Sequence, residues 1–385
     1  MAIYLDNAAT SFPKPESVYA AIDQANRNSA IAAGRGTYQR ASDSNRIIAQ
    51  CRSAIAQKIN ATANQISFAF SGTDALCTAI FGFLNPGDHA IASSADHTSV
   101  LRPLWELESR GVQLTIVPCD EHGVVAVEDI QSAIKDNTKL VCLTHASNVT
   151  GALQDAASIG QLCQSKGVKF LLDAAQTIGD LGIDVQNLNC DFLAAPGHKG
   201  LLGPLGTGFL YTSEAVSPSC APFRFGGTGS TGDGKNQPEK SPDKFESGNQ
   251  NVPGIAGLVE ALKWLESNEA ADREKALTEN FQHLVKALNE IENVQLYGLA
   301  SERTTTLSFN IKGIDCQTIG TLLDSQFQIE CRTGLHCAPL IHDPIGATEH
   351  GGTVRLSPGR FTTREEIDQT ISAVRQIAIE MGAMT

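Results

Sequence analysis

Short apolar runs alternate with longer segments of helical periodicity through the first half of the chain. Apolar runs of this length between turn residues are typical of buried strands. Strands that are separated by segments of helical length predict βαβ units, and therefore a mostly parallel sheet with helices on both faces. The predicted strands cover residues 66–70, 90–92, 114–117, 140–143, 170–172 and 192–195. The predicted helical segments cover 101–109, 156–165 and 16–57, the last of which is interrupted at 34–36.

The second half of the chain begins with a change of composition. Residues 226–251 are rich in Gly, Ser, Thr, Pro, Lys and Asp, which predicts a long loop. Pro253 then opens a helix with one apolar face, and we expect this helix to connect to a second domain. The predicted elements that follow are strands at 305–311 and 354–357 and a final helix whose capping box is Thr363 with Glu366.

Length, charge and cysteine usage narrow the class of protein. A chain of 385 residues is long enough for two domains. The 42 acidic and 29 basic residues give a net charge of −13, which argues against a nucleic-acid-binding surface but leaves room for a local anion pocket. We see no secretory signal, membrane span, CxxC pair or zinc spacing, so we expect a cytoplasmic protein with reduced thiols and no metal site.

Candidate chemistry begins at Lys199, which lies between glycines directly after the predicted strand 192–195. A lysine amine at a strand exit can form a Schiff base with a carbonyl cofactor. Most lysines are solvated surface charges, so the tripeptide Gly-His-Lys is a weak signal by itself. In a parallel α/β sheet, ligands bind at the carboxyl ends of the strands. The residues at the other strand ends therefore indicate whether Lys199 belongs to a cofactor site.

Two of these strand ends carry groups that suit a phosphorylated pyridine. Ser71, Gly72 and Thr73 open a predicted helix, whose dipole and unpaired N–H groups favour a phosphate, although a plain helix cap fits equally well. Asp173 ends an apolar strand, where a carboxylate could keep a pyridinium nitrogen protonated. Gln176 follows and could donate to a phenolic oxygen. An aspartate that caps the next helix is the alternative.

Two further strand ends carry a histidine and an asparagine. His97 follows the strand at 90–92 and could stack on a flat ring, although a surface histidine is the commoner case. Asn148 follows the strand at 140–143 and could bind a ring oxygen or a substrate carboxylate, although asparagine is also an ordinary turn residue. Each alternative is reasonable singly. Together, the groups at successive strand ends favour a cofactor site.

The motifs together resemble the cysteine desulfurase branch of the class V, fold-type-I pyridoxal-phosphate (PLP) enzymes. The resemblance runs nearly end to end. Its most specific segment is Arg-Thr-Gly-Leu-His-Cys-Ala at 332–338, which is similar to the Arg-x-Gly-x-His-Cys-Ala signature of the group with a short, ordered cysteine loop. The other motifs are Tyr-Leu-Asp-Asn-Ala-Ala-Thr at 4–10, Ser-Gly-Thr-Asp-Ala-Leu at 71–76, Asp-His at 96–97, Ser-Asn-Val at 147–149, Asp-Ala-Ala-Gln at 173–176 and Gly-His-Lys at 197–199.

The resemblance implies a fold-type-I PLP-dependent transferase of the α/β class. It implies a large PLP-binding domain over residues 14–260, with a mostly parallel seven-stranded sheet between helices. Residues 1–13 and 261–385 would form a smaller α+β domain. It also implies a homodimer with shared active sites.

The resemblance also implies the cofactor contacts. Lys199 would bind PLP covalently, and His97 would stack over its pyridine ring. Asp173 would pair with the ring nitrogen and Gln176 with the phenolic oxygen. The implied phosphate contacts are Gly72, Thr73 and His198, together with Thr228, which would reach the active site of the partner subunit.

The implied reaction converts L-cysteine to L-alanine. Cys337, as a thiolate, would attack the substrate sulfur and carry it as a persulfide to a sulfur-acceptor protein. Lys199 and His97 would move protons, and His336 and Arg332 would supply positive charge beside the thiolate. Iron–sulfur cluster assembly, tRNA thiolation and selenium metabolism are the open uses of the sulfur, and nothing in the sequence names the acceptor protein. The implied substrate contacts are Asn148, which also borders the cofactor, and Arg355, whose planar fork suits a carboxylate.

One residue departs from the family pattern. Pro196 lies where the family usually has a serine whose hydroxyl helps to bind phosphate, so one phosphate contact is lost or replaced. Other activities of the same fold stay open, namely a cysteine or cystine C–S lyase, a selenocysteine lyase and a plain aminotransferase. A non-catalytic protein that keeps the fold is the least favoured alternative, because the lysine, the acid and the anion-binding groups are all present.

Overall fold

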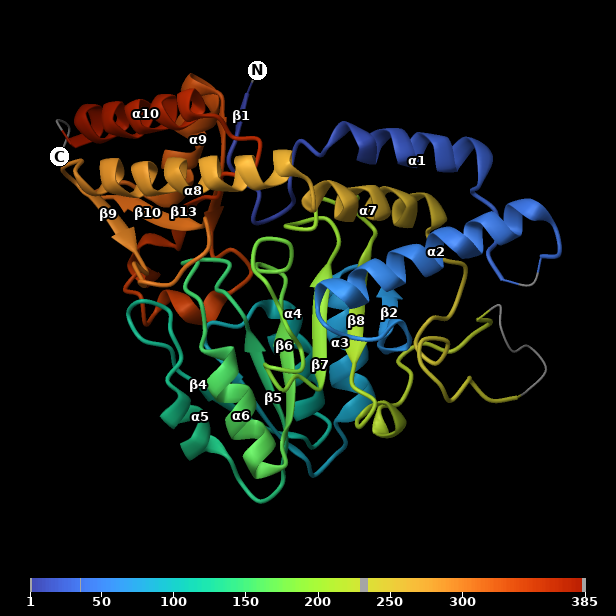
Figure 1. Cartoon of the computed structure of the whole chain (residues 1–385). Helices are drawn as coiled ribbons and strands as arrows, with labels where there is room; N and C mark the ends of the chain where they lie inside the picture. The colour runs from blue at the N-terminus through green and yellow to red at the C-terminus, as the bar shows by residue number, and fades with distance from the viewer. Residues whose placement is uncertain (1, 35, 229–234, 383–385) are drawn as a thin grey trace.

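A seven-stranded sheet forms the centre of the molecule in the computed structural model, which describes residues 2–34, 36–228 and 235–382 (Figure 1). The strand order is β2-β8-β7-β6-β5-β3-β4, and β8 alone runs antiparallel to its neighbours. The mostly parallel sheet is therefore confirmed. The strands are β2 (Ile66–Ala69), β3 (His89–Ser93), β4 (Gln113–Val117), β5 (Thr138–Thr144), β6 (Lys169–Asp173), β7 (Phe192–Pro196) and β8 (Gly208–Thr212).

Helices cover both faces of this sheet because side chains alternate along each strand. In β6, Phe170 and Leu172 pack on one face and Leu171 packs on the other. The face of Leu171 is covered by α3 (Gly72–Phe83) and α4 (Thr98–Glu108). The opposite face is covered by α2 (Gln39–Lys58), α5 (Val127–Ala133), α6 (Ala156–Lys166) and α7 (Val252–Leu265), and α1 (Glu16–Asn28) lies beside α7.

A second, antiparallel sheet of four strands lies towards the C-terminal end of the chain, in the order β12-β13-β10-β9. Its apolar face packs with three helices in a separate core cluster. Thr363 and Glu366 form the predicted capping box at the last of these helices. The elements are β9 (Val294–Tyr297), β10 (Leu307–Ile311), β12 (Arg332–Gly334), β13 (Thr353–Leu356), α8 (Asn268–Asn289), α9 (Cys316–Phe327) and α10 (Arg364–Gly382).

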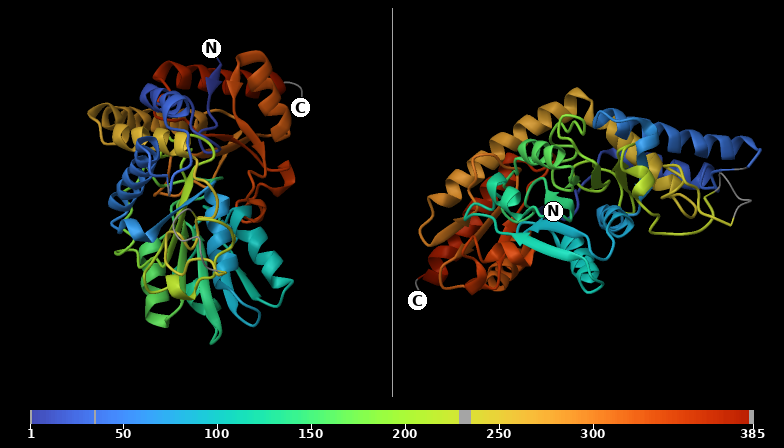
Figure 2. Two further views of the ribbon diagram at one scale, coloured as in Figure 1. Left: turned by 90° about the vertical axis from the view of Figure 1, so that its right-hand side faces the viewer. Right: turned by 90° about the horizontal axis from the view of Figure 1, so that it is seen from below.

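The beginning of the chain packs with this C-terminal part. Strand β1 (Ile3–Tyr4) pairs in parallel with β11 (Ile329–Glu330), and Ile3 and Leu5 belong to the core cluster of the second sheet. Figure 2 shows the N-terminus beside α10. Conversely, Ala338 and Ile341, which follow the cysteine motif, pack in the core of the large sheet. The domain boundaries inferred from the sequence stay a prediction.

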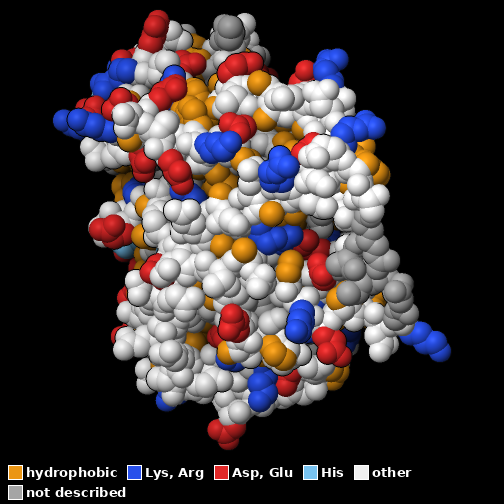
Figure 3. Space-filling model, turned by 45° about the vertical axis from the view of Figure 1, so that its right-hand side comes forward, with side chains coloured by type: hydrophobic (Ala, Val, Ile, Leu, Met, Phe, Trp, Pro, Cys, Tyr) orange, Lys and Arg blue, Asp and Glu red, His pale blue; other side chains and the backbone are white. Residues whose placement is uncertain are grey.

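The predicted long loop lacks helices and strands between η2 (Ser217–Ser219) and α7 in its described part, and residues 229–234 within it lie outside the described residues. Among the described residues, no helix has both the length and the apolar character needed to cross a membrane. On the face shown in Figure 3, Lys and Arg side chains are interspersed with Asp and Glu side chains and do not gather into one basic surface.

Candidate active site

A cavity of about 220 Å³ opens at the carboxyl ends of the parallel strands. Its lining residues come from strand ends that are far apart in the sequence, because the carboxyl ends of parallel strands lie at the same edge of the sheet. Thr228 and Cys337 are the predicted site residues that do not line it. The predicted residues that do line it are Gly72, Thr73, His97, Asn148, Asp173, Gln176, His198, Lys199 and Arg355.

The start of α3 forms one end of the cavity. Ser71 caps the helix, because its Oγ accepts from the N–H of Asp74 at 3.1 Å. The first N–H groups of a helix have no acceptor within the helix, so those of Gly72 and Thr73 are available to an anion, which the helix dipole also favours. Thr73 Oγ1 lies 2.7 Å from the hydroxyl of Ser99. This end of the cavity therefore suits a phosphate.

Pro196 ends β7 at the same place. A Cβ added to Gly72 would come within 3.1 Å of Pro196 Cδ, so the glycine allows the proline ring to pack against the helix start. Both residues line the cavity. The proline ring offers no hydrogen-bond donor to an anion at this end of the cavity.

Asp173 is the last residue of β6 and lines the cavity. Burial raises the pKa of its carboxyl group, while the N–H of Ala175, at 2.9 Å, and the ammonium of Lys199 act in the opposite direction. A cation placed against this carboxylate would stabilise the ionised form. Nearby, Gln176 Nε2 donates to the carbonyl of Ala8 at 3.0 Å.

Lys199 follows β7 and lines the same cavity as Asp173. Burial lowers its pKa from 10.5 to about 8, and Asp173 partly opposes the shift. A lysine with a lowered pKa is a better nucleophile at neutral pH, because more of its amine is uncharged. The preceding residue, His198, is held by the N-terminal segment, since its Nδ1 lies 3.1 Å from Thr10 Oγ1 and its carbonyl accepts from Ser11 N at 3.0 Å.

His97 lies at the N-terminus of α4, and its Nδ1 accepts from the N–H of Ser99 at 3.0 Å. Burial and then the charge of Lys199 lower the pKa of His97 to about 3. The ring is therefore neutral at physiological pH. Since Nδ1 is an acceptor, the proton of the neutral ring lies on Nε2.

Cys337 lies in a short loop that two hydrogen bonds fix at the rim of the cavity. Thr98 N–H, the first of α4, donates to the Cys337 carbonyl at 2.7 Å, and Asn148 Nδ2 donates to the His336 carbonyl at 2.7 Å. His336 and Cys337 both have positive φ angles, 51° and 60°, in a region that non-glycine residues rarely adopt. The loop is thus held in one unusual conformation.

The thiol itself is accessible. All ten cysteines lie within the described residues, and Cys337 is the one whose side chain is exposed. Arg332, which lines the cavity, donates from Nη2 to Cys337 Sγ at 2.9 Å. This hydrogen bond holds the sulfur of Cys337 beside a residue of the cavity lining.

The prediction that His336 supplies positive charge beside Cys337 is wrong. Its ring is buried, and burial, followed by the charge of Arg355, lowers the pKa of His336 well below 6.5. The ring packs with Nε2 close to the carbonyl and hydroxyl of Thr353, at 3.0 and 2.9 Å. The motif places this histidine next to the cysteine in sequence, but the backbone directs its ring into the core. Of the two residues expected to supply positive charge, Arg332 alone does so.

Arg355 is the deepest charged group of the site, with 1% of its side chain exposed. Its Nη2 pairs with the carboxylate of Asp6, and its Nη1 donates to the carbonyl of Asn148 at 2.9 Å. Sequence reasoning placed Arg355 in the site but assigned no role to Asp6. Asp6 stands in the N-terminal motif, yet its partner is 349 residues away, and no local pattern reveals that contact.

The residues around the cavity fit PLP. The start of α3 offers N–H groups to a phosphate, Asp173 offers a carboxylate to a ring nitrogen, and Lys199 offers an amine to an aldehyde. The burial of Asp173, which raises the pKa of its carboxyl group, is the observation that most favours a cationic ring at this position, because such a ring would stabilise the ionised form.

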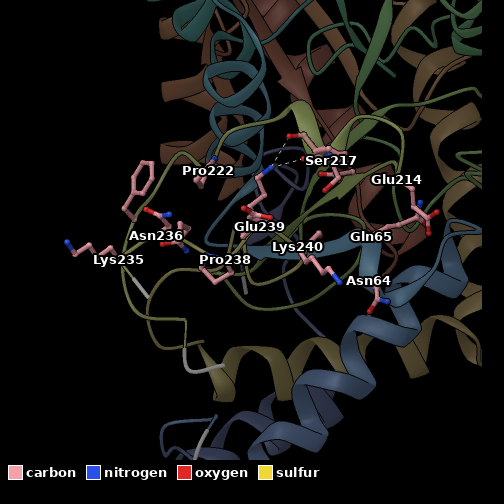
Figure 4. A pocket seen from close by; sticks show the side chains of 16 residues that line it. Asn64, Gln65, Glu214, Ser217, Pro222, Lys235, Asn236, Pro238, Glu239 and Lys240 are labelled. Atoms are coloured by element: carbon pink, nitrogen blue, oxygen red, sulfur yellow. Dashed lines mark hydrogen bonds between the residues drawn. The ribbon is translucent and has the colours of Figure 1, made fainter. Parts of the chain in front are cut away.

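A larger cavity, about 800 Å³, lies between the loop after β8 and the segment before β2 (Figure 4). Lys235, Asn236 and Glu239 from the loop line it, with Asn64 and Gln65 opposite. Lys244 and Ser217 also line the cavity, and Lys244 Nζ donates to the carbonyl of Ser217 at 2.8 Å. None of the predicted site residues lines this cavity, so its size does not make it the candidate site.

The family model for class-V aminotransferases matches residues 3–370. The chain therefore belongs to this family. It is 34% identical to a probable cysteine desulfurase from Methanothermobacter thermautotrophicus, over 98% of this chain and 94% of that protein. It is 31% identical to a cysteine desulfurase from Pectobacterium carotovorum, over 99% of this chain and 94% of that protein.

Solved structures give the same result for the fold. An apo cysteine desulfurase from Thermococcus onnurineus superposes with a TM-score of 0.91 and 28% identity, covering 98% of this chain and 95% of that chain. A cysteine desulfurase from Escherichia coli superposes with a TM-score of 0.88 and 28% identity, covering 99% and 95%. The expected fold, that of the fold-type-I PLP enzymes, is confirmed.

Proposed function

We propose that this protein is a PLP-dependent cysteine desulfurase, which converts L-cysteine to L-alanine and forms a persulfide on Cys337. The observation that carries the proposal is the placement of Cys337. It is the exposed cysteine of the chain, it accepts a hydrogen bond from Arg332 at 2.9 Å, and its loop is fixed at the rim of the Lys199 cavity. The names of the full-length relatives support the same reaction.

In this proposal PLP supplies an electron sink for the carbon skeleton of the bound amino acid. The chain's own residues hold the cofactor. Lys199 would bind it, Asp173 would keep its ring nitrogen protonated, and the first N–H groups of α3, with Thr73 and His198, would hold its phosphate. Gln176 would donate to its phenolic oxygen, and the neutral ring of His97 would stack on it.

The substrate is held and cleaved by a second set of groups. Arg355 and Asn148 bind its carboxylate, and Lys199 and His97 move protons to and from its α-carbon and thiol. The Cys337 thiolate then attacks the substrate sulfur. A sulfur–sulfur bond forms, the carbon–sulfur bond breaks, and its electron pair stays on the substrate carbon, which takes up a proton and leaves as alanine.

The deciding experiment is product analysis with L-cysteine. We expect L-alanine and a protein-bound persulfide in equal amounts before reductant is added, and sulfide only after a thiol reductant is added. A cysteine or cystine lyase would instead release pyruvate, and a plain aminotransferase would need a keto-acid partner. Equal or greater rates on selenocysteine would favour the selenocysteine lyase alternative.

The pH dependence of cofactor capture should report the environment of Lys199. Burial lowers the pKa of Lys199 to about 8, so the neutral, nucleophilic amine becomes the main form as the pH rises through about 8. We expect the rate at which cofactor-free protein captures PLP to rise with this midpoint and then level off. Absorbance of the bound cofactor across a pH series measures it.

The matched variant for this experiment is Asp173→Asn. Asp173 raises the pKa of Lys199, so its neutralisation should move the midpoint to lower pH. A midpoint near the ordinary lysine pKa of 10.5 in the unchanged protein would contradict a buried amine.

Pro196→Ser is expected to tighten PLP binding by about tenfold, because one hydrogen bond to a charged group is worth roughly that much. The new hydroxyl would lie at the phosphate end of the cavity, next to Gly72. The dissociation rate of PLP measures the effect. Pro196→Ala is the control, since it removes the same ring without adding a donor. Equal release from the two variants would show that position 196 does not contact the phosphate.

We further propose a homodimer in which Thr228 of each subunit completes the partner's phosphate site. Thr228 does not line the cavity of its own chain. Two exposed phenylalanines support a partner here: Phe70, shortly before α3, is 57% exposed, and Phe225, three residues before Thr228, is 74% exposed. We also propose a cytoplasmic location and delivery of the sulfur to an acceptor protein for iron–sulfur cluster assembly.

A further inference from the structure

The guanidinium of Arg355 already has a carboxylate partner within the chain. Asp6 Oδ1 lies 2.5 Å from Nη2, and within the described parts of the chain no other carboxylate pairs with Arg355. Nη1 donates to the carbonyl of Asn148, while Nε has no partner among the described residues. A buried arginine requires such a counter-ion, because an unpaired charge in the interior is strongly unfavourable.

Asp6 contacts Nη2 of Arg355, the nitrogen that takes part in both ways in which a guanidinium binds a carboxylate through two hydrogen bonds. A guanidinium binds a carboxylate bidentately either through Nη1 with Nη2 or through Nε with Nη2. Both edges therefore include Nη2, which is the atom that Asp6 contacts. A second carboxylate that approaches Arg355 must share this nitrogen with Asp6, and the two negative charges repel each other at that distance.

The backbone of Asp6 is fixed, but its side chain can turn away. Leu5 N–H donates to Glu330 O at 2.9 Å, and Asn7 N–H donates to Ser357 O at 3.1 Å, so the peptide on either side of Asp6 is held. The side chain of Asp6 is 22% exposed, whereas that of Arg355 is 1% exposed. A change of the Asp6 side-chain rotamer would therefore bring its carboxylate into water and leave the backbone in place.

We propose that Asp6, which lies just outside the lining of the cavity, occupies Nη2 of Arg355 in the substrate-free site, and that it sets substrate affinity by competing with the substrate carboxylate for this nitrogen. The inference rests on the proposed function, since it takes the Lys199 cavity as the amino acid site. Asp6 keeps the empty protein stable by pairing a buried cation. It makes binding weaker, because part of the attraction of Arg355 for a substrate is already used.

The first test measures binding of L-alanine, the expected product, to cofactor-loaded Asp6→Asn by calorimetry. Asparagine keeps the shape of the side chain and removes its charge. We expect the Kd of L-alanine to fall by about tenfold, and the KM for L-cysteine to fall while kcat does not rise. Unchanged or weaker L-alanine binding would overturn the proposal, because it would mean that Asp6 only orients Arg355.

Asp180→Asn is the matched control. Asp180 pairs with Arg360 at 3.2 Å, and Arg360 is also buried, with 4% of its side chain exposed. Asp180 pairs with Arg360 and not with Arg355. Arg360 also pairs with Glu274 at 3.2 Å, so this variant removes one of two carboxylates from a second buried arginine and reports the general effect of losing such a charge. A tenfold gain in L-alanine affinity here as well would count against a specific role of Asp6.

A second test uses cofactor-free protein and acetate, and it does not depend on the reaction. Asp6→Ala removes the carboxylate, and acetate is expected to raise its thermal unfolding midpoint more than that of the unchanged protein or of Asp180→Asn. An equal effect of acetate on all three proteins overturns the competition. Failure to desulfurate cysteine would instead overturn the proposed function while leaving this acetate result to decide on Asp6.

Discussion

Lys199→Ala is expected to abolish covalent retention of PLP and to lower the rate of alanine formation by about 1,000-fold or more. The variant loses both the amine that binds the cofactor and one of the two groups proposed to move protons. Its buried environment, which lowers the pKa to about 8, makes Lys199 the reactive amine of the cavity. Borohydride reduction of the loaded protein, followed by peptide mass mapping, should mark this lysine.

The chain offers a matched control in Lys14→Met. Burial also lowers the pKa of Lys14 to about 8, and its ammonium donates to Ser11 Oγ at 2.9 Å, but it does not line the cavity. We expect this variant to retain PLP through Lys199. Borohydride labelling of Lys14 in the unchanged protein, or full retention of PLP by Lys199→Ala, would contradict the assignment.

Cys337→Ala is expected to eliminate the protein-bound persulfide while leaving PLP binding intact. Cys337 does not line the cofactor cavity, so the colour of the loaded protein should not change. The rate of alanine formation should fall by about 1,000-fold or more, because the sulfur no longer has a nucleophile to accept it. Persulfide labelling with an alkylating reagent and mass spectrometry measures the first effect.

The control for this variant is Cys331→Ala. Cys331 is half-buried, lies six residues earlier in the chain, and has its pKa raised to about 12 by burial, so it should remain a thiol. We expect Cys331→Ala to form the persulfide at the normal rate. Undiminished sulfur transfer to an acceptor by Cys337→Ala would rule out the proposed role of Cys337.

The predicted elements of the large sheet were correct because each depends on local pattern. Ser71 at the end of a strand and the start of a helix, for example, is visible in a few neighbouring residues, and the structure confirms it as a cap. Strand β8 was not predicted. Its five residues form a short apolar run, and its antiparallel direction is set by β2 and β7 on either side.

The candidate site likewise contains residues that local sequence pattern predicts and contacts that it does not predict. Residues at strand ends, such as Asp173 and Lys199, were found because parallel strands bring their ends together. The neutral state of His336 was not predicted, because burial of its ring depends on Thr353 and on a positive φ that the sequence does not reveal. The ion pair of Asp6 with Arg355 joins opposite ends of the chain and was likewise beyond local reasoning.

The pairing of β1 with β11 has a consequence for how the protein is made. Residues 3–4 can find their place only after residue 330 has been synthesised, and Asp6 can pair only after Arg355 has been synthesised. Ala8 and Ala9, which follow, form part of the cavity wall. A nascent chain can therefore build the large sheet early, but it completes the cofactor cavity only after residue 355 has been synthesised.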